Sequence, residues 1–307
     1  MTQTSQADKL AQLHEQIAGG VEALVESDAW RAMLDTAAKF HRYSLNNLLL
    51  IALQAPEATR VAGFGTWKSL GRQVRKGERG IAILAPCTYR PKKAKTDNPT
   101  SAQEPAGPAE SGGTPEAAAS GRPGGQVRGF RTAYVFDISQ TDGEALPEIT
   151  APIAGQAPEG LWDGLAAQVA GHGYTLERGH CRGAEGYTDP TSRTVRVRAD
   201  VDDAQAVLTL AHELAHIECG HVEDLPTYTT CRGRCEVEAE SVAYVVAGAF
   251  GLDAGASTFG YVAGWAGGDA TKVRQAAETV TKAARTILGH LEAASSTDQQ
   301  PAEELAA

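Results

Sequence analysis

Two histidines four residues apart, His212 and His216, enclose a glutamate at position 213 in the stretch HELAH. On an α-helix, residues four apart stand on one face, so both imidazoles can reach a single point. Neutral imidazole is a good ligand for Zn²⁺, and a glutamate beside the metal can take a proton from water. The pattern H-E-x-x-H therefore predicts a zinc site with His212 and His216 as metal ligands and Glu213 as catalytic base.

A catalytic zinc of this kind needs a third protein ligand. His221 follows on the same stretch, but it falls one residue before the place of the third histidine in the longer pattern H-E-x-x-H-x-x-G-x-x-H. We therefore do not expect it to bind metal. The nearby cysteines lack a second pair at zinc-site spacing, and free cysteine usually behaves as a small apolar residue. These cysteines are Cys219, Cys231 and Cys235.

Three acids, Glu236, Glu238 and Glu240, open the next helical segment. The positive end of the helix dipole would account for acids at a helix start without any metal. It accounts less well for their clustering beside a histidine pair that lacks a third ligand. We expect Glu236 to be that ligand, with Glu238 as the alternative. Glu240, one turn on, is expected to hydrogen-bond a ligand histidine.

Residues 170–252 resemble the ImmA/IrrE-type gluzincin metallopeptidases. The likeness rests on HELAH and, some twenty residues later, the segment E-V-E-A-E-S-V-A, where that family has E-x-x-A-N-x-F-A. The resemblance implies a zinc-dependent endopeptidase with a small sheet packed on the active-site helix, and with Glu236 as third ligand. Glu240 departs from the family's asparagine but keeps a hydrogen-bond acceptor.

Residues 40–86 combine cations, aromatic rings and amides. Single-stranded nucleic acid is held by cations along its backbone and by aromatic faces on which bases stack, while amides contact phosphates or base edges. The alternative is that the aromatic residues are core and the basic run is a solvated loop. The candidate strand-binding residues are Tyr43, Asn46, Asn47, Arg60, Phe64, Trp67, Lys68, Arg72, Arg75, Lys76 and Arg79.

The formal net charge of the 307 residues is −10, which taken as one number argues against nucleic-acid binding. Residues 1–93, however, hold 13 basic and 8 acidic side chains, a local charge of +5, and the remainder carries −15. We therefore expect DNA to meet only the basic face of the first part.

Residues 5–141 resemble the N-terminal domain of the ArdC-type antirestriction proteins. Four motif blocks occur in the family's order, from Phe40-x-x-Tyr43-Ser44 through ATRVAGFGTW and GRQVRKGERGIAILAP to VFDISQT. In that family the N-terminal domain binds single-stranded DNA and is joined to a zinc metallopeptidase-like domain. The resemblance implies the same two-part order here.

The apolar spacing predicts an α+β protein of two domains, and the resemblance to the gluzincin metallopeptidases implies a small sheet packed on the helix that carries His212. Helices are predicted over residues 7–26, 30–40, 45–54, 161–170, 203–221, 235–249 and 270–292, and strands over 80–86, 131–138, near 174, 185–188 and 194–198. We expect a strand-binding domain over 1–142 with a flexible insertion at 94–129. This domain is followed by a linker at 143–158, a zincin-like domain over 159–292 and a disordered tail over 293–307.

These features predict a single-stranded-DNA-binding zinc metallopeptidase that protects incoming mobile-element DNA or cleaves DNA-associated proteins. Two alternatives are a non-catalytic strand-coating protein with structural zinc and a peptidase that cleaves a transcriptional repressor. The polar start has no secretory signal, and the most apolar stretch, 242–250, is far below the ~20 residues of a membrane span. With five cysteines, an odd number, reduced thiols and a cytoplasmic location are expected.

Overall fold

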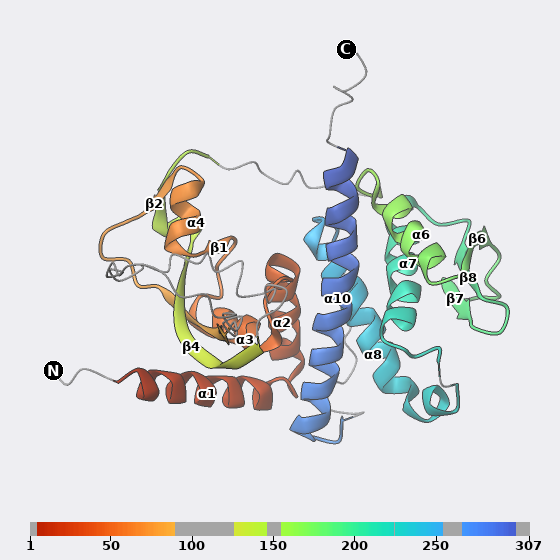
Figure 1. The fold of residues 1–307 in the computed structure, drawn as a ribbon. Coiled ribbons are helices and arrows are strands. Elements are labelled where there is room, and N and C mark those ends of the chain that lie inside the picture. Colours follow the sequence, from red (N-terminus) through yellow and green to blue (C-terminus); the bar gives the residue numbers. More distant parts are fainter. Residues whose placement is uncertain (1–4, 90–125, 146–154, 224, 254–265, 299–307) are drawn as a thin grey trace, which may run out of the picture.

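The computed structural model describes residues 5–89, 126–145, 155–223, 225–253 and 266–298. They form an α+β protein of two domains, as predicted (Figure 1). The N-terminal part contains α1 (Gln6–Ala23), α2 (Ser27–Phe40), α3 (Leu45–Gln54), β1 (Val61–Ala62), α4 (Phe64–Ser69), β2 (Arg72–Val74), β3 (Ile81–Tyr89), β4 (Gln126–Asp137), a 3₁₀ turn (Ile138–Gln140) and β5 (Thr141–Gly143). The C-terminal part contains α6 (Leu161–Gly171), β6 (Thr175–Gly179), β7 (Gly186–Asp189), β8 (Thr194–Arg198), α7 (Asp203–Glu218), α8 (Leu225–Ala249) and α10 (Ala270–Asp298).

The first sheet has the order β1-β4-β3, with both pairs antiparallel, and β2 pairs with β5 separately. Ile81, Ile83 and Val135 point to the buried face, as the two-residue alternation of a half-buried strand requires. Helix α3 packs on β3. The Asn47 amide donates to the Leu84 carbonyl at 3.0 Å and accepts from the Leu84 N–H at 2.9 Å, which fixes the helix on the strand.

The second sheet has the order β6-β8-β7, with β6 and β8 parallel and β7 and β8 antiparallel. Val195 and Val197 of the central strand are fully buried, and α7 packs on β7 and β8. This sheet against the HELAH helix is the arrangement that the resemblance to the gluzincin metallopeptidases implies.

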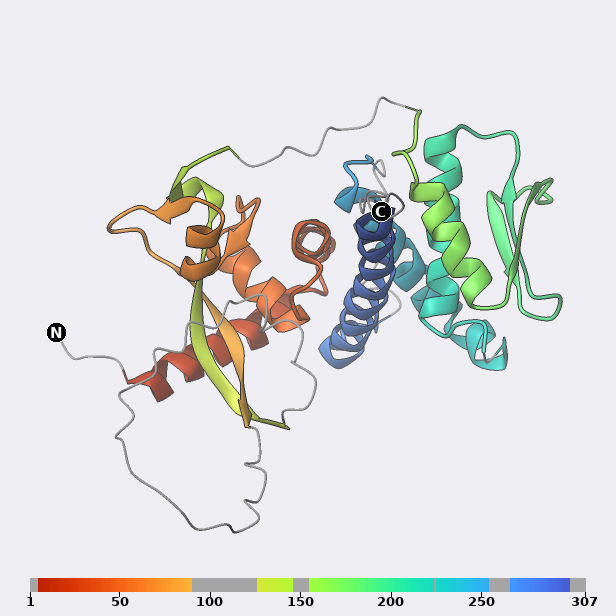
Figure 2. The same ribbon diagram turned by 45° about the horizontal axis from the view of Figure 1, so that its top comes forward.

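The two domains are packed together through α2, α8 and α10. Helix α2 lies on α8, where the buried Trp30 indole donates to Ser241 Oγ at 3.0 Å. Figures 1 and 2 show α10 between the N-terminal part and helices α6 and α7. The buried apolar side chains of both parts belong to one continuous cluster. The relative position of the two parts is therefore set by core packing.

Several elements differ from their predicted bounds. Strand β4 begins at Gln126, inside the predicted insertion, and α10 continues to Asp298, six residues into the predicted tail. The other segments predicted to be unstructured, 94–125, 146–154 and 299–307, lie outside the described residues. Helix α8 begins at Leu225 and not at 235, and a non-helical residue, Cys231, interrupts it. The short elements α4, β1, β2 and β5 lack a periodic pattern long enough to predict.

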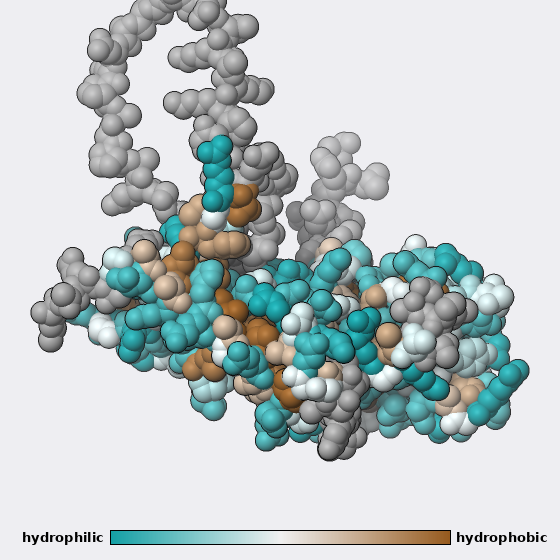
Figure 3. All heavy atoms as spheres, turned by 90° about the horizontal axis from the view of Figure 1, so that it is seen from below, coloured by the Kyte–Doolittle hydropathy of each residue, from teal (hydrophilic) through white to brown (hydrophobic). Residues whose placement is uncertain are grey.

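The face in Figure 3 is largely hydrophilic, and its hydrophobic spheres gather over the N-terminal part. Large apolar residues exposed on the described surface are Leu53, Phe64, Leu70, Val127, Phe130 and Tyr134. Among the helices of the described residues, none combines the length and the apolar character that a membrane span requires.

Candidate metal centre

Helix α7 carries the HELAH stretch on its buried side. Asp202 caps the helix, because its side chain accepts from the Gln205 N–H at 2.8 Å. Leu210 and Leu214 are fully buried between the second sheet and the neighbouring helices. This packing fixes the helix rotation, so that His212 and His216 face α8.

The two histidines meet a carboxylate from α8. His212 Nε2 lies 3.1 Å from His216 Nε2, and Glu236 Oε2 lies 3.5 Å from the first and 3.9 Å from the second. Two nitrogens bound tetrahedrally at about 2.05 Å are separated by about 3.3 Å. The donor set of two imidazoles and one carboxylate thus fits a divalent ion such as zinc with little movement.

A buried chain of side chains holds His216 from behind. His216 Nδ1 lies 3.0 Å from His221 Nδ1, and His221 Nε2 lies 2.8 Å from Glu238 Oε2. An ionised carboxylate only accepts, so His221 donates from Nε2 and its Nδ1 becomes an acceptor. His216 must then donate from Nδ1, which leaves its Nε2 lone pair directed at the metal position. The chain Glu238–His221–His216 therefore selects the tautomer that can bind metal.

The other histidine has its own carboxylate partner. Glu240 Oε2 lies 3.4 Å from His212 Nδ1, on the side away from His216. Glu238, the alternative third ligand, contacts His221 instead of the metal position. The three acids of α8 thus have separate places: Glu236 faces the metal point, Glu240 faces His212, and Glu238 faces His221.

Glu213 lies against the second sheet beside the histidines. Its Oε2 accepts from the Thr188 hydroxyl of β7 at 2.7 Å, and burial raises the pKa of its carboxyl. Gly186 faces it: a Cβ at that position would stand 2.6 Å from Thr209 Cγ2 and 3.1 Å from Glu213 Oε1. That Cβ would also stand 2.9 Å from the Arg196 carbonyl oxygen, so only glycine fits between Thr209 and the Arg196 backbone beside this carboxylate.

The acidic surroundings stabilise one positive charge between the histidines. Burial by itself lowers the pKa of His212, but hydrogen bonds with Glu236 and Glu240 raise it to about 10. Burial and the neighbouring charge on His212 lower the pKa of His216 to about 3. The carboxylates of Glu236 and Glu240 therefore favour one positive charge at the histidine pair, and that charge disfavours a second one on His216.

Two hollows flank this centre and share Gly186, His212 and Glu213. The first, about 370 Å³, extends toward Glu240 and Tyr244. The second, about 380 Å³, extends past His216 and Glu236 toward Pro190 and Arg232. Glu213 therefore lines the wall of both hollows.

The structure divides the candidate strand-binding residues into two groups. Asn47, Trp67 and Arg72 are buried: Trp67 Nε1 donates to the Phe136 carbonyl at 2.9 Å, and Arg72 Nε donates to Thr141 Oγ1 at 2.8 Å. The other eight are exposed or half-buried. They are Tyr43, Asn46, Arg60, Phe64, Lys68, Arg75, Lys76 and Arg79. Arg75 is 2.8 Å from Glu78, and Asn46 Oδ1 accepts from Arg274 at 3.4 Å.

Sequence reasoning missed two residues that support the centre. His221 falls at the wrong spacing for a ligand, yet it contacts a ligand through its ring. Thr188 lies on a strand whose pairing brings it to Glu213. The sequence carried only a weak signal for either residue: each lies in the part of the chain that was predicted to form the metal-binding domain.

Comparison with known proteins gives the two halves separate relatives. Residues 7–136 match the N-terminal domain of anti-restriction factor ArdC, and residues 172–254 match the IrrE N-terminal-like peptidase domain. The chain is thus similar to an ArdC-type domain in its first part and to an IrrE-like domain in its second. This confirms the resemblance inferred from the motifs of both halves.

Individual relatives are distant. The metal-free crystal structure of the antirestriction protein ArdC from plasmid R388 is 21% identical, covers 82% of this chain and 85% of its own, and has a TM-score of 0.48. The Mn(II)-bound structure of that protein is 20% identical, with coverage of 81% and 84% and a TM-score of 0.45. An uncharacterized protein of Bacillus anthracis is 26% identical over 260 residues, a match that covers 74% of this chain. The matched region spans only 41% of that relative's length.

Proposed function

We propose that the chain is a single-stranded-DNA-binding zinc metallopeptidase of the antirestriction type, acting on proteins bound to incoming DNA. The observation that carries this proposal is the convergence of His212, His216 and Glu236 beside Glu213. Zinc bound there would acidify water and polarise a peptide carbonyl.

The geometry favours a catalytic over a purely structural metal. Structural zinc sites are closed by four protein ligands, whereas catalytic sites have three and an open position. Within the described residues, only three side chains converge on the metal point, and hollows open on both sides of it. Both features support a site that admits a substrate.

The residues of this chain divide the work of peptide hydrolysis. Glu213 accepts the proton of the attacking water, and Thr188 holds its carboxylate toward the cleft. The chain Glu238–His221 keeps His216 in its ligand tautomer. Glu240 does the same for His212 from the opposite side.

The N-terminal domain would hold the strand. Its exposed cations Lys68, Arg75, Lys76 and Arg79 and the exposed ring of Phe64 supply the backbone and base contacts that unpaired DNA needs. Binding to DNA places the cleft near other DNA-bound proteins, at a local concentration of roughly millimolar. We place this activity in the cytoplasm, where thiols stay reduced.

The decisive test is Glu213→Gln, with Glu218→Gln on the same helix as matched control. The first variant should keep its zinc and lose cleavage of a protein bound to single-stranded DNA, because only the base is removed. The control should cleave as the wild type does. If Glu213→Gln still cleaves, the peptidase proposal is wrong. If neither the wild type nor either variant cleaves, yet all three protect DNA in cells, the chain is a non-catalytic strand-coating protein.

A separate measurement tests strand binding. Affinity for an oligonucleotide should fall with rising salt, with a logarithmic slope of roughly 0.7 per phosphate contact. Cleavage of a repressor without any DNA, unchanged when Lys76 and Arg79 are replaced by Glu, would favour the repressor-directed alternative.

A further inference from the structure

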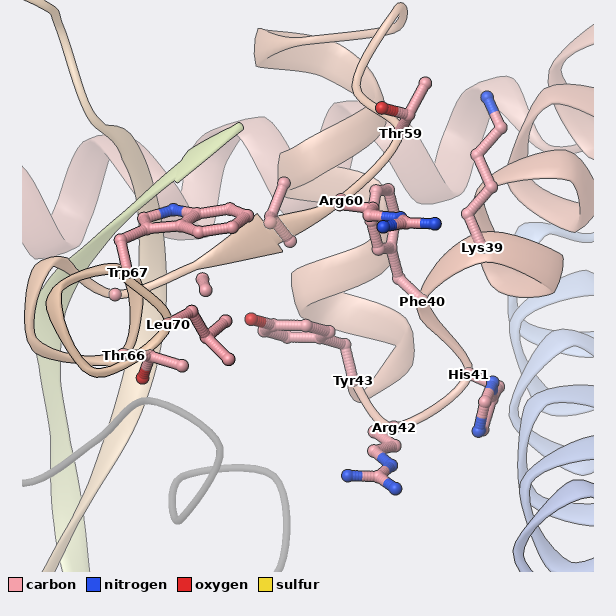
Figure 4. Close-up of a pocket in the computed structure, with 13 residues that line it drawn as sticks. Lys39, Phe40, His41, Arg42, Tyr43, Thr59, Arg60, Thr66, Trp67 and Leu70 are labelled. Atoms are coloured by element: carbon pink, nitrogen blue, oxygen red, sulfur yellow. The ribbon is translucent and has the colours of Figure 1, made fainter. Parts of the chain in front are cut away.

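The N-terminal domain contains a pocket far along the chain from the metal centre. Its volume is about 400 Å³, and it lies between the end of α2, the segment leading into β1, and α4. Figure 4 shows Tyr43 extending toward Leu70 and Trp67, with Arg60 and Lys39 above its ring in the view and Arg42 below it. Its size and mixed lining are those of a small-molecule site.

Each wall of the pocket is fixed by hydrogen bonds from outside it. Asp137 accepts from the N–H groups of Thr59 and Arg60 at 2.8 and 3.0 Å. Trp67 is anchored through its indole to the Phe136 carbonyl. Arg285 of α10 donates to the carbonyls of His41 and Tyr43. The pocket is therefore preformed, which lowers the entropic cost of filling it.

The lining joins aromatic faces to positive charge. Tyr43 packs edge-on against Phe40, with ring centroids 6.4 Å apart, so its orientation is set. Lys39, Arg42 and Arg60 supply the cations, and no carboxylate is among the described lining residues. Arg42 also pairs with Glu292 at 2.9 Å, outside the lining. The ligand that matches is a flat ring attached to phosphate.

We propose that this pocket takes in one unpaired nucleobase of a bound DNA strand, stacked on Tyr43, with its flanking phosphates at Lys39 and Arg60. This assignment rests on the proposed strand binding and adds a location for one base. A base in a duplex is stacked and paired on both sides, so entry from a duplex would require flipping, which costs a few kcal/mol. The pocket thus predicts a preference for single strands over duplex.

The test measures the affinity of the full chain for a labelled oligo-dT strand by fluorescence anisotropy. Removing one stacking ring weakens strand binding by ~1–3 kcal/mol, so Tyr43→Leu should weaken it about 5- to 150-fold. Tyr43→Phe, which keeps the ring, should bind as the wild type does. Tyr134→Leu, an exposed aromatic residue on β4 outside the pocket, is the matched control.

A second pair of variants avoids any effect on packing. Leu70 is 46% exposed at the pocket, and Leu53 is 55% exposed on α3. A carboxylate about 4 Å from a phosphate in water costs about 1 kcal/mol, so Leu70→Glu should weaken binding about 5-fold relative to Leu53→Glu, which changes the net charge equally.

An abasic strand of the same length separates base insertion from phosphate binding. The wild type should bind it more weakly than oligo-dT, and Tyr43→Leu should distinguish the two strands less than the wild type does, because only base contacts outside the pocket, such as those of Phe64, remain. If the wild type binds no single strand, the proposed function fails. If it binds, but Leu70→Glu equals Leu53→Glu and the abasic strand binds equally well, the pocket is not a base site and strand binding stands.

Discussion

Replacing Glu238 by Gln should weaken zinc binding, although Glu238 is not one of the proposed metal ligands. The carboxylate of Glu238 only accepts, so it forces the proton of His221 onto Nε2 and the proton of His216 onto Nδ1. An amide can donate as well as accept. With Gln at this position, His221 can carry its proton on Nδ1, and His216 is then protonated on Nε2, where it cannot bind metal.

The size of the effect follows from burial. Glu238, His221 and His216 are 2%, 7% and 6% exposed, so water does not replace a lost partner. A hydrogen bond to a charged group contributes about 1.5–3 kcal/mol, which corresponds to roughly 10- to 150-fold in a binding constant. Partners behind metal ligands typically change metal affinity about 10- to 100-fold. We therefore expect Glu238→Gln to weaken zinc binding about 10- to 100-fold.

The assay is competition for zinc with a chromophoric chelator at constant pH. Glu218→Gln is the matched control, because Glu218 also pairs with a histidine, His172, at 2.7 Å, but away from the metal point. Its zinc affinity should equal that of the wild type. Urea unfolding of the metal-free proteins shows whether each variant is folded. A folded Glu238→Gln protein with wild-type zinc affinity would refute the tautomer argument.

Two further predictions concern single positions. Gly186→Ala should lower both stability and cleavage, because the new Cβ would stand 2.6 Å from Thr209 Cγ2; Gly179→Ala, where the nearest atom is 3.7 Å away, should leave cleavage unchanged in the same peptidase assay. Burial favours the neutral form of Asp137, but hydrogen bonds from Ser139, Arg60 and Thr59 outweigh it and lower the pKa of its carboxyl. Its contribution to stability is therefore present above about pH 4 and is lost as the pH falls through the lowered folded pKa. Urea unfolding from pH 6 to pH 3 should show a smaller loss for Asp137→Asn than for the wild type.

The elements with long periodic patterns could be predicted from the sequence. The convergence of the three candidate metal ligands could be predicted too, while their binding of metal stays a prediction. Helix α3 and strand β8 have their predicted bounds, because each is an unbroken apolar pattern with clear ends. His212 and His216 are recognisable because one helical turn joins them. The prediction of Glu236 required only the assumption that the next helix, α8, packs back against α7.

Roles that depend on distant pairing were not predictable. Arg72 belongs to a basic run that reads as solvent-exposed, but its guanidinium bonds to Thr141 and Gly143, some seventy residues later. The indole N–H of Trp67 similarly donates to the Phe136 carbonyl. Composition cannot distinguish such residues from surface contacts, since the partner comes from another strand. Three candidates, Asn47, Trp67 and Arg72, are thus buried, and strand contact by the other eight stays a prediction.

The packing of α2 changes how the two domains are expected to cooperate. Its C-terminal end supplies Lys39 and Phe40 to the pocket in the N-terminal domain. Its middle packs on α8, where Asp35 accepts from the Tyr244 hydroxyl at 2.6 Å beside the cleft. A flexible tether would present the cleft to any protein within reach. A buried helix contact instead holds the cleft at one position relative to the strand. The proposed peptidase should therefore cleave only those DNA-bound proteins whose chain passes that position, and moving the protein along the strand should abolish cleavage without weakening DNA binding.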